Sequence, residues 1–142
     1  MKMKSDEIYH FLRHGTFTGK VATVRPDGRP HLAPIWFVID DDNNDLVFTT
    51  GHASQKAKNI LRDPRVSISV DDQCPLYSFV IVEGIAKTTN QPDELLTWAT
   101  KIAERYMGKN NAETYGKRNS AEGELLVRVK PTKILGQKDI SA

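Results

Sequence analysis

Hydroxyl and cationic side chains gather within residues 46–60, where an apolar stretch runs into a helix. Thr49 and Thr50 end the stretch, and Ser54 and Lys56 open the helix. Backbone N–H groups at a helix start have no intrahelical partner and carry partial positive charge, so this arrangement suits a bound anion such as a phosphate. The spacing is equally typical of a surface helix in which Ser54 is only the N-cap and Lys56 is solvated.

The neighbouring residues 33–37 favour the anion site over the plain surface helix. This stretch is apolar and aromatic, with Ile35, Trp36 and Phe37, and its Pro34 has no N–H to donate to a neighbouring strand. We therefore expect an edge strand or an interrupted strand here. An apolar surface beside an anion site suits a flat ring that carries a phosphorylated tail.

The other reactive side chains indicate little chemistry. Cys74 is the only cysteine and has no neighbouring His to activate it, so neither a disulfide nor a thiol nucleophile is expected. His10 and His14 have half of a zinc-site spacing, and no second ligand pair completes it. Residues 40–45 hold four carboxylates but lack the Gly and Glu of a calcium loop, which favours a solvated hairpin turn. We predict no catalytic side chain and no metal.

The elements that must position these residues are mostly strands. A short helix is expected from Ser5 to about His14, a second one after Ser54, and a long one over residues 92–107, whereas residues 108–123 are polar and loop-like. Gly84 indicates a bulge. The expected strands cover residues 21–24, 32–39, 46–50, 65–70, 77–88 and 124–129. Six strands joined by short turns predict a small antiparallel barrel with helices packed outside.

Length and composition limit the function classes. A chain of 142 residues fits one domain, residues 1–142. Its net charge of +2 comes from 20 basic and 18 acidic residues that are scattered through the sequence, so we expect no nucleic-acid partner. The longest apolar run, residues 79–82, is too short to cross a bilayer, and no signal-peptide pattern opens the chain. Together with the single cysteine, this predicts a cytoplasmic protein with no membrane partner.

Several short segments, taken together, carry a resemblance to a known group of proteins. They are GKVATV (residues 19–24), DGRPH (27–31), PIWF (34–37), TTG (49–51), SQKAKN (54–59), RDPRV (62–66) and VEG (82–84), with PTKILG (131–136) near the end. In this order and spacing, the chain resembles the pyridoxamine 5′-phosphate oxidase-like, FMN-binding split-barrel superfamily. Within it, the chain is similar to the small flavin/deazaflavin oxidoreductases, which include members dependent on coenzyme F420.

The resemblance implies a fold and a function. The fold would be mainly β (α+β), a six-stranded antiparallel split β-barrel of Greek-key type with outer helices. The cofactor would be FMN or coenzyme F420, bound at a homodimer interface, and the reaction would be hydride transfer between that cofactor and a small-molecule acceptor. The alternative that the resemblance leaves open is a non-catalytic protein of the same fold that binds flavin, haem or a tetrapyrrole.

The resemblance also implies the cofactor-binding residues. By the family pattern, the phosphate end is held around Thr49, Thr50 and Ser54, the backbone from His31 to Trp36 runs along the ring, and a second chain covers the ring. The full implied set is His31, Ala33, Pro34, Ile35, Trp36, Thr49, Thr50, Ser54, Gln55, Lys56, Asn59, Tyr77 and Phe79, the last two coming from the second chain.

The chain departs from the true pyridoxamine phosphate oxidases in two respects. It has His31, Trp36 and Gln55 where those enzymes place basic residues against the FMN phosphate, and it lacks their C-terminal Arg/His segment that grips pyridoxal phosphate. We therefore do not expect oxidation of vitamin B6.

Overall fold

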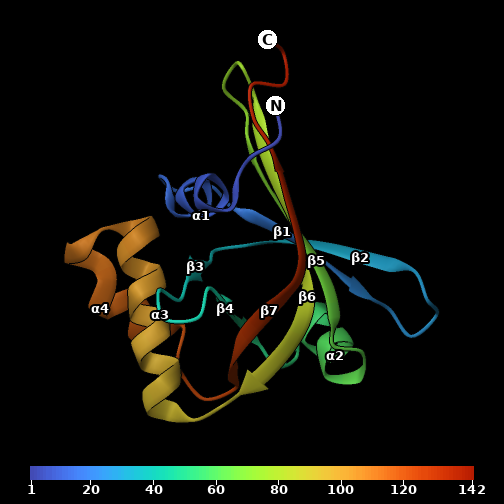
Figure 1. The fold of residues 1–142 in the computed structure, drawn as a ribbon. Coiled ribbons are helices and arrows are strands. Elements are labelled where there is room, and N and C mark those ends of the chain that lie inside the picture. The colour runs from blue at the N-terminus through green and yellow to red at the C-terminus, as the bar shows by residue number, and fades with distance from the viewer.

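The structure, a computed structural model, describes all of residues 1–142 and consists of one seven-stranded antiparallel sheet with four helices around it (Figure 1). The strands are β1 (Gly19–Val24), β2 (Pro30–Ile35), β3 (Val38–Ile39), β4 (Leu46–Gly51), β5 (Arg65–Asp72), β6 (Ser78–Thr89) and β7 (Glu124–Gln137). The helices are α1 (Ser5–Arg13), α2 (Gln55–Arg62), α3 (Pro92–Met107) and α4 (Lys109–Arg118). None of the helices is both long and apolar enough to cross a membrane.

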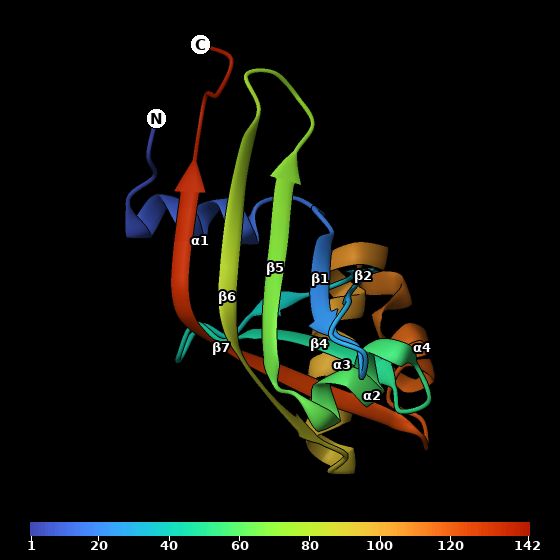
Figure 2. The same cartoon turned by 90° about the vertical axis from the view of Figure 1, so that its right-hand side faces the viewer.

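The sheet has the strand order β2-β1-β5-β6-β7-β4-β3 and curves around the core. Figure 2 shows β7, β6, β5 and β1 side by side, with β4 crossing behind them. The alternation predicted for β5 is confirmed, since Val66, Ile68 and Val70 are buried and belong to an 18-residue apolar cluster. Antiparallel strands with one face on the core alternate in this way. The structure is an antiparallel β half-barrel with outer helices, which is consistent with the expected split barrel.

The predicted strand count of six is wrong, because the expected strand over residues 32–39 is split into β2 and β3. Between them, the Phe37 backbone bonds to side chains of α3 instead of a strand. Its N–H donates to the Tyr106 hydroxyl at 3.2 Å, and its carbonyl accepts from Arg105 Nη1 at 2.8 Å. These bonds interrupt the ladder and give a seventh strand. The prediction that Pro34 lies on an edge strand is confirmed, since β2 ends the sheet.

The prediction of a loop over residues 108–123 is also wrong, because α4 occupies Lys109–Arg118. This helix has little apolar periodicity, so local pattern gives no signal for it. It forms against α3, where Ala112 and Gly116 are its buried residues. A Cβ at Gly116 would lie 2.9 Å from the Thr100 Cα, so the two helices approach closely at this glycine.

The last strand is longer than expected. We predicted that it stops before Pro131, but β7 runs to Gln137 and pairs with β6 along its length. The continuation is possible because the register shifts by one residue at Glu83 and Gly84, with Gly84 opposite Pro131. A proline without an N–H is tolerated at such a bulge. The bulge predicted at Gly84 is thereby confirmed.

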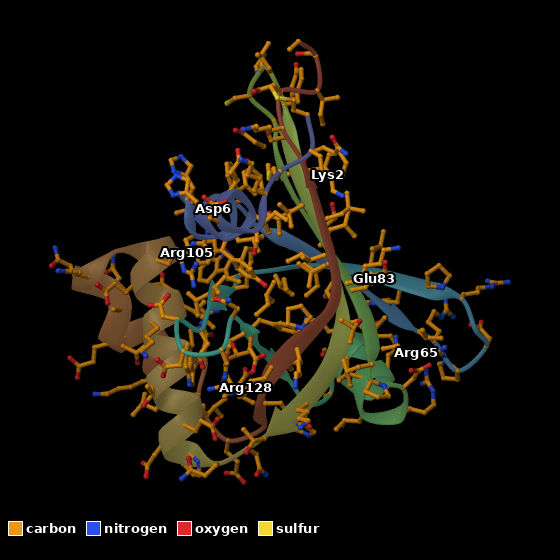
Figure 3. All side chains as sticks on the ribbon, viewed as in Figure 1. Lys2, Asp6, Arg65, Glu83, Arg105 and Arg128 are labelled. Carbon is orange, nitrogen blue, oxygen red and sulfur yellow. The ribbon has the colours of Figure 1, made fainter.

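The acidic residues 40–45 form the turn between β3 and β4, as expected, with the Asp40 N–H donating to the Asp45 carbonyl at 2.9 Å. The expectation of full solvation is wrong for Asp40, which is buried and bonds to Arg128 Nη1 at 2.8 Å. Burial acts to raise the pKa of Asp40, but the bonds from Arg128 and from the Asp42 N–H outweigh it and lower that pKa. Figure 3 shows Arg128 on the side of β7 that faces α3.

Candidate functional site

One cavity joins the ends of several elements that are distant in the sequence. It has a volume of about 410 Å³ and lies where β2 and β4 end and α2 begins. That volume is within the usual range of about 300–1,000 Å³ for small-molecule sites. The lining residues are Thr18, Pro34, Ile35, Trp36, Thr49, Thr50, Gly51, Ser54, Lys56, Ile102, Asn119 and Glu124. Seven of the thirteen predicted binding residues are therefore brought together.

The polar part of the cavity is built by the connection from β4 to α2. Ser54 is the N-cap of α2, and its hydroxyl accepts from the Ala57 N–H at 3.2 Å. The Thr50 hydroxyl lies 2.9 Å from the Ser54 hydroxyl. Capping uses an acceptor lone pair of Ser54, and one of the two hydroxyls donates to the other, so one hydroxyl hydrogen of the pair remains as a donor.

The charges of the cavity are one ammonium and one carboxylate. Lys56, at the second position of α2, is half-buried and makes no ion pair or hydrogen bond within the chain. Burial lowers the pKa of Lys56, and Coulombic attraction from Glu124 acts in the opposite direction. Burial likewise raises the pKa of the Glu124 carboxyl, and Lys56 and His52 oppose that rise. Both groups are thus partly removed from water and lack a bonded partner.

The apolar part of the cavity contains the side chain of Trp36, which is held in place by Tyr106. The Trp36 indole, 36% exposed, stacks on the Tyr106 ring with 5.1 Å between ring centroids and 3° between planes. The Tyr106 hydroxyl donates to the Phe17 carbonyl at 2.7 Å and accepts from the Phe37 N–H, and these two hydrogen bonds fix the position of the Tyr106 ring. The indole therefore has one face against Tyr106, so its other face is available to a planar ligand.

Arg105 fixes the backbone around this aromatic pair. Its guanidinium donates to the carbonyls of Leu12 and Phe37, each at 2.8 Å, and to that of Gly15 at 3.0 Å. Burial lowers the pKa of Arg105, and the neighbouring Tyr106 opposes this shift. Figure 3 shows the side chain between α1 and α3. A single cation thus ties the end of α1, the β2–β3 connection and α3 together.

Four of the predicted residues lie on β2 or α2 but do not line the cavity. Gln55 donates to Asn59 Oδ1 at 2.8 Å, and the buried Asn59 donates to the Thr23 hydroxyl at 3.0 Å, so this pair ties α2 to β1. His31 and Ala33 are half-buried on β2. The Nδ1 atom of His31 is buried without a hydrogen-bond partner.

Tyr77 and Phe79, predicted to act from a second chain, lie far from the cavity of their own chain. The tip of the β5–β6 hairpin stands beside the two chain ends and away from α2 (Figure 1). The Ile140 N–H donates to the Tyr77 carbonyl at 3.0 Å, which places the tip against the C-terminal segment. Tyr77 is 45% exposed and Phe79 is half-buried.

Sequence reasoning missed several lining residues. Thr18 precedes β1, Ile102 lies on α3, and Asn119 and Glu124 flank the turn between α4 and β7. Ile102 lies on the long helix that the sequence predicts over residues 92–107, but that prediction does not indicate that it faces a cavity. Asn119 lies in the segment that the sequence predicts as a loop, and Glu124 begins the strand predicted over residues 124–129, but no pattern in the sequence indicates that either residue reaches the cavity.

Comparison with known proteins gives a family and a set of similar folds. The family model described as "Pyridoxamine 5′-phosphate oxidase" matches residues 5–138. A conserved hypothetical protein from Mycobacterium tuberculosis superposes with a TM-score of 0.80 at 30% identity, over 93% of this chain and 82% of the other. A structure named F420 reductase superposes with a TM-score of 0.71 at 31% identity, over 89% of this chain and 94% of the other.

More distant structures share the fold alone. The heme storage protein HutZ from Vibrio cholerae superposes with a TM-score of 0.71 at 20% identity, over 92% of both chains. The fold is thus common to a protein named as a reductase and to one named for heme storage, and fold alone does not decide between such functions.

Proposed function

The chain belongs to the pyridoxamine 5′-phosphate oxidase family, and on this premise we propose that it is an oxidoreductase. It transfers a hydride between a bound flavin (FMN) or deazaflavin (coenzyme F420) and a small-molecule acceptor. The single observation that carries this proposal is the cavity in which Lys56 and three hydroxyl groups lie together with the open face of Trp36.

The donor set of the cavity fits a phosphorylated, planar cofactor. Lys56 supplies an ammonium, while Thr49, Thr50 and Ser54 supply hydroxyl groups at the start of a helix, where anions are favoured. The indole of Trp36 supplies a flat apolar surface. In FMN or in F420 alike, Lys56 and the hydroxyl groups would hold the phosphate, and Trp36 would contact the ring.

The contribution of the protein is binding, orientation and exclusion of water. The bound ring supplies the chemistry, since its reactive position accepts or donates the hydride. Tyr106 keeps the Trp36 indole in place, so a substrate and the ring can be held at a fixed separation. Ile35 and Ile102 form apolar walls of the same cavity and exclude water there.

A homodimer that completes the site is part of the proposal. Support comes from the β5–β6 tip, where Leu76 is 47% and Tyr77 45% exposed on a hairpin that stands away from its own cavity. Tyr77 and Phe79 of a second copy would then cover the ring. Light scattering should give the mass of two chains, and Tyr77→Ser should lower cofactor affinity without breaking the dimer. A monomer that binds cofactor at full affinity would contradict this arrangement.

The alternative is a carrier protein that binds such a ligand without turnover. Haem iron in proteins is held by His, Cys, Met or Tyr side chains, and none of these lines the cavity. Within one chain the lining therefore offers haem iron no ligand, whereas Tyr77, which a second copy would bring to the ring, is a side chain of that kind.

The test is a titration of the purified protein with FMN and with F420, in which binding is monitored by Trp fluorescence. Binding should quench Trp36, so Trp36→Phe should lose the quenching, whereas Trp98→Phe, which replaces the tryptophan outside the cavity, should keep it. The protein loaded with reduced cofactor should then reduce a quinone dye. Binding without reduction of any acceptor would support the carrier, and binding of neither cofactor would refute both functions.

A further inference from the structure

Two turns meet at the part of the cavity that holds its charged groups. The first leads from β4 into α2 and is closed by the Ser54 N–H, which donates to the Gly51 carbonyl at 3.0 Å. The second precedes β7 and is closed by the Glu124 N–H, which donates to the Ala121 carbonyl at 3.1 Å. Gly51, Ser54 and Glu124 all line the cavity, so the separation of the two turns sets its width at this end.

His52 joins the two turns through one carbonyl group. Its backbone N–H donates to the Gly123 carbonyl at 2.8 Å, and its ring nitrogen Nδ1 lies 2.7 Å from the same oxygen. Because a carbonyl oxygen only accepts hydrogen bonds, Nδ1 must carry a hydrogen and donate it. The imidazole thus supplies the only side-chain hydrogen bond between the two turns.

Gly123 is suited to this contact by its conformation and by its size. Its φ is +93°, the value that a type II turn requires at its third residue and that glycine adopts without strain. A Cβ at Gly123 would lie 3.2 Å from His52 Nδ1, closer than ordinary van der Waals contact. A larger residue here would therefore push the imidazole away from the carbonyl that it holds.

His52 does not reach the ligand itself. The residue is exposed and does not line the cavity, whereas Gly51 precedes it and Ser54 follows two positions later, and both do. On the opposite wall, Glu124 follows Gly123 directly. Any effect of His52 on the site must therefore pass through the residues beside it on the two turns.

We propose that His52 is a positioning residue for this site, which holds the turn before β7 against the turn before α2 and so keeps the cavity preorganised for a phosphorylated ligand. The inference rests on the proposed function, since that ligand is the phosphorylated cofactor of the proposal. Without the imidazole bond, the wall with Ser54 and Lys56 can move relative to the wall with Glu124. Ligand binding must then restore the order, which weakens the affinity.

Two substitutions separate the hydrogen bond from the bulk of the ring. His52→Asn keeps a donor, because the amide nitrogen of Asn is as many bonds from the backbone as Nδ1 of His. His52→Leu fills a similar space without a donor. His10→Leu is the matched control, since His10 is an exposed histidine on α1 that does not line the cavity. Fluorescence titration gives the dissociation constants for FMN, F420 and riboflavin.

His52→Leu should bind the cofactor that the wild type binds, FMN or F420, about 3–10-fold more weakly, the range that corresponds to one neutral hydrogen bond. Riboflavin lacks the phosphate and does not use the anion site, so its affinity should change by less than about twofold. His52→Asn should restore cofactor binding to within about twofold of the wild type, and His10→Leu should change none of the affinities.

A second measurement needs no ligand. NMR spectra of the ring nitrogens in the free protein should show that Nδ1 of His52 carries a hydrogen and that Nε2 is the nitrogen without one when the ring is neutral. A merely structural role would not give the pattern of affinities, because a general loosening of the cavity weakens riboflavin binding to the same extent and is not reversed by one amide donor.

Four results would overturn the inference while the proposed function stands. They are a neutral His52 ring with its hydrogen on Nε2, cofactor binding by His52→Leu equal to that of the wild type, an equal loss of riboflavin affinity in His52→Leu, and cofactor binding by His52→Asn as weak as that by His52→Leu. If the wild type binds neither FMN nor F420, the proposed function fails and the inference fails with it.

Discussion

Replacement of Lys56 by Met should separate cofactor binding from stability. Lys56 is half-buried, its pKa is lowered by burial, and no carboxylate bonds to it, so its charge does not stabilise the folded chain. Met has nearly the same helix propensity as Lys and fills the same space without a charge. We expect the free energy of unfolding of Lys56→Met to be equal to that of the wild type or higher by up to about 1 kcal/mol.

Cofactor binding should change in the opposite direction. A hydrogen bond from an ammonium to a phosphate contributes about 1.5–3 kcal/mol, and its loss corresponds to a dissociation constant larger by about 10–150-fold. FMN and F420 should both be affected, whereas riboflavin, which lacks the phosphate, should bind Lys56→Met as it binds the wild type.

Lys58→Met is the matched control for this substitution. Lys58 lies on the same helix, is exposed and does not line the cavity, so the loss of its charge tests for unspecific attraction. Fluorescence titration gives the affinities, and urea unfolding followed by circular dichroism gives the stabilities. Equal affinities of the two variants would refute the phosphate role of Lys56. A loss of stability above about 2 kcal/mol in Lys56→Met alone would show instead that its charge holds the fold together.

Three further predictions concern the frame around the site. Gly84→Ala places a Cβ 2.6 Å from the Lys130 carbonyl oxygen at the bulge, so the urea midpoint should fall by the equivalent of about 1–3 kcal/mol; an unchanged midpoint would mean that the two strands separate freely there. Tyr106→Phe keeps the stacked ring but removes a hydroxyl with two backbone bonds, which should lower stability by about 1–3 kcal/mol in the same assay, and a neutral effect would contradict its anchoring role. Hydrogen bonds from Arg65 lower the pKa of Asp63 to about 2, so its stabilisation is present above pH 4 and is lost as the pH falls toward 2. NMR titration should find this value, Asp63→Asn should lose this part of the pH dependence, and an ordinary Asp pKa would refute the pairing.

The elements that the sequence predicts well are those whose signal is local. The long helix α3 is confirmed over Pro92–Met107, because apolar residues recur at helical spacing and Pro92 occupies its first position. The helix after Ser54 is also confirmed, and its signal is local as well, because the Ser54 hydroxyl caps the N–H of Ala57, three residues later. Period-two alternation likewise located β5.

The elements that the sequence missed depend on contacts with distant segments. The helix α4 has a polar sequence and forms where Gly116 lets it approach α3. The split between β2 and β3 arises because α3 residues bond to Phe37 from 68 and 69 positions away. The extension of β7 past Pro131 needs the bulge of the neighbouring strand. Each of these features depends on a partner that lies outside any local stretch of sequence, so local sequence patterns could not predict it.

The same division holds within the site. The turn from β4 into α2, with Ser54 as the N-cap and Lys56 at the second helical position, follows from the local sequence, because capping and helix-start geometry depend on neighbours along the chain. The residues that face this turn come from distant segments and depend on the folded chain. The β4–β7 ladder brings in Glu124, and the end of α3 places Tyr106 against Trp36, because sheet pairing and ring stacking join residues about 70 positions apart. Those distant contacts bring a carboxylate and a stacked aromatic pair to the cavity beside the start of α2.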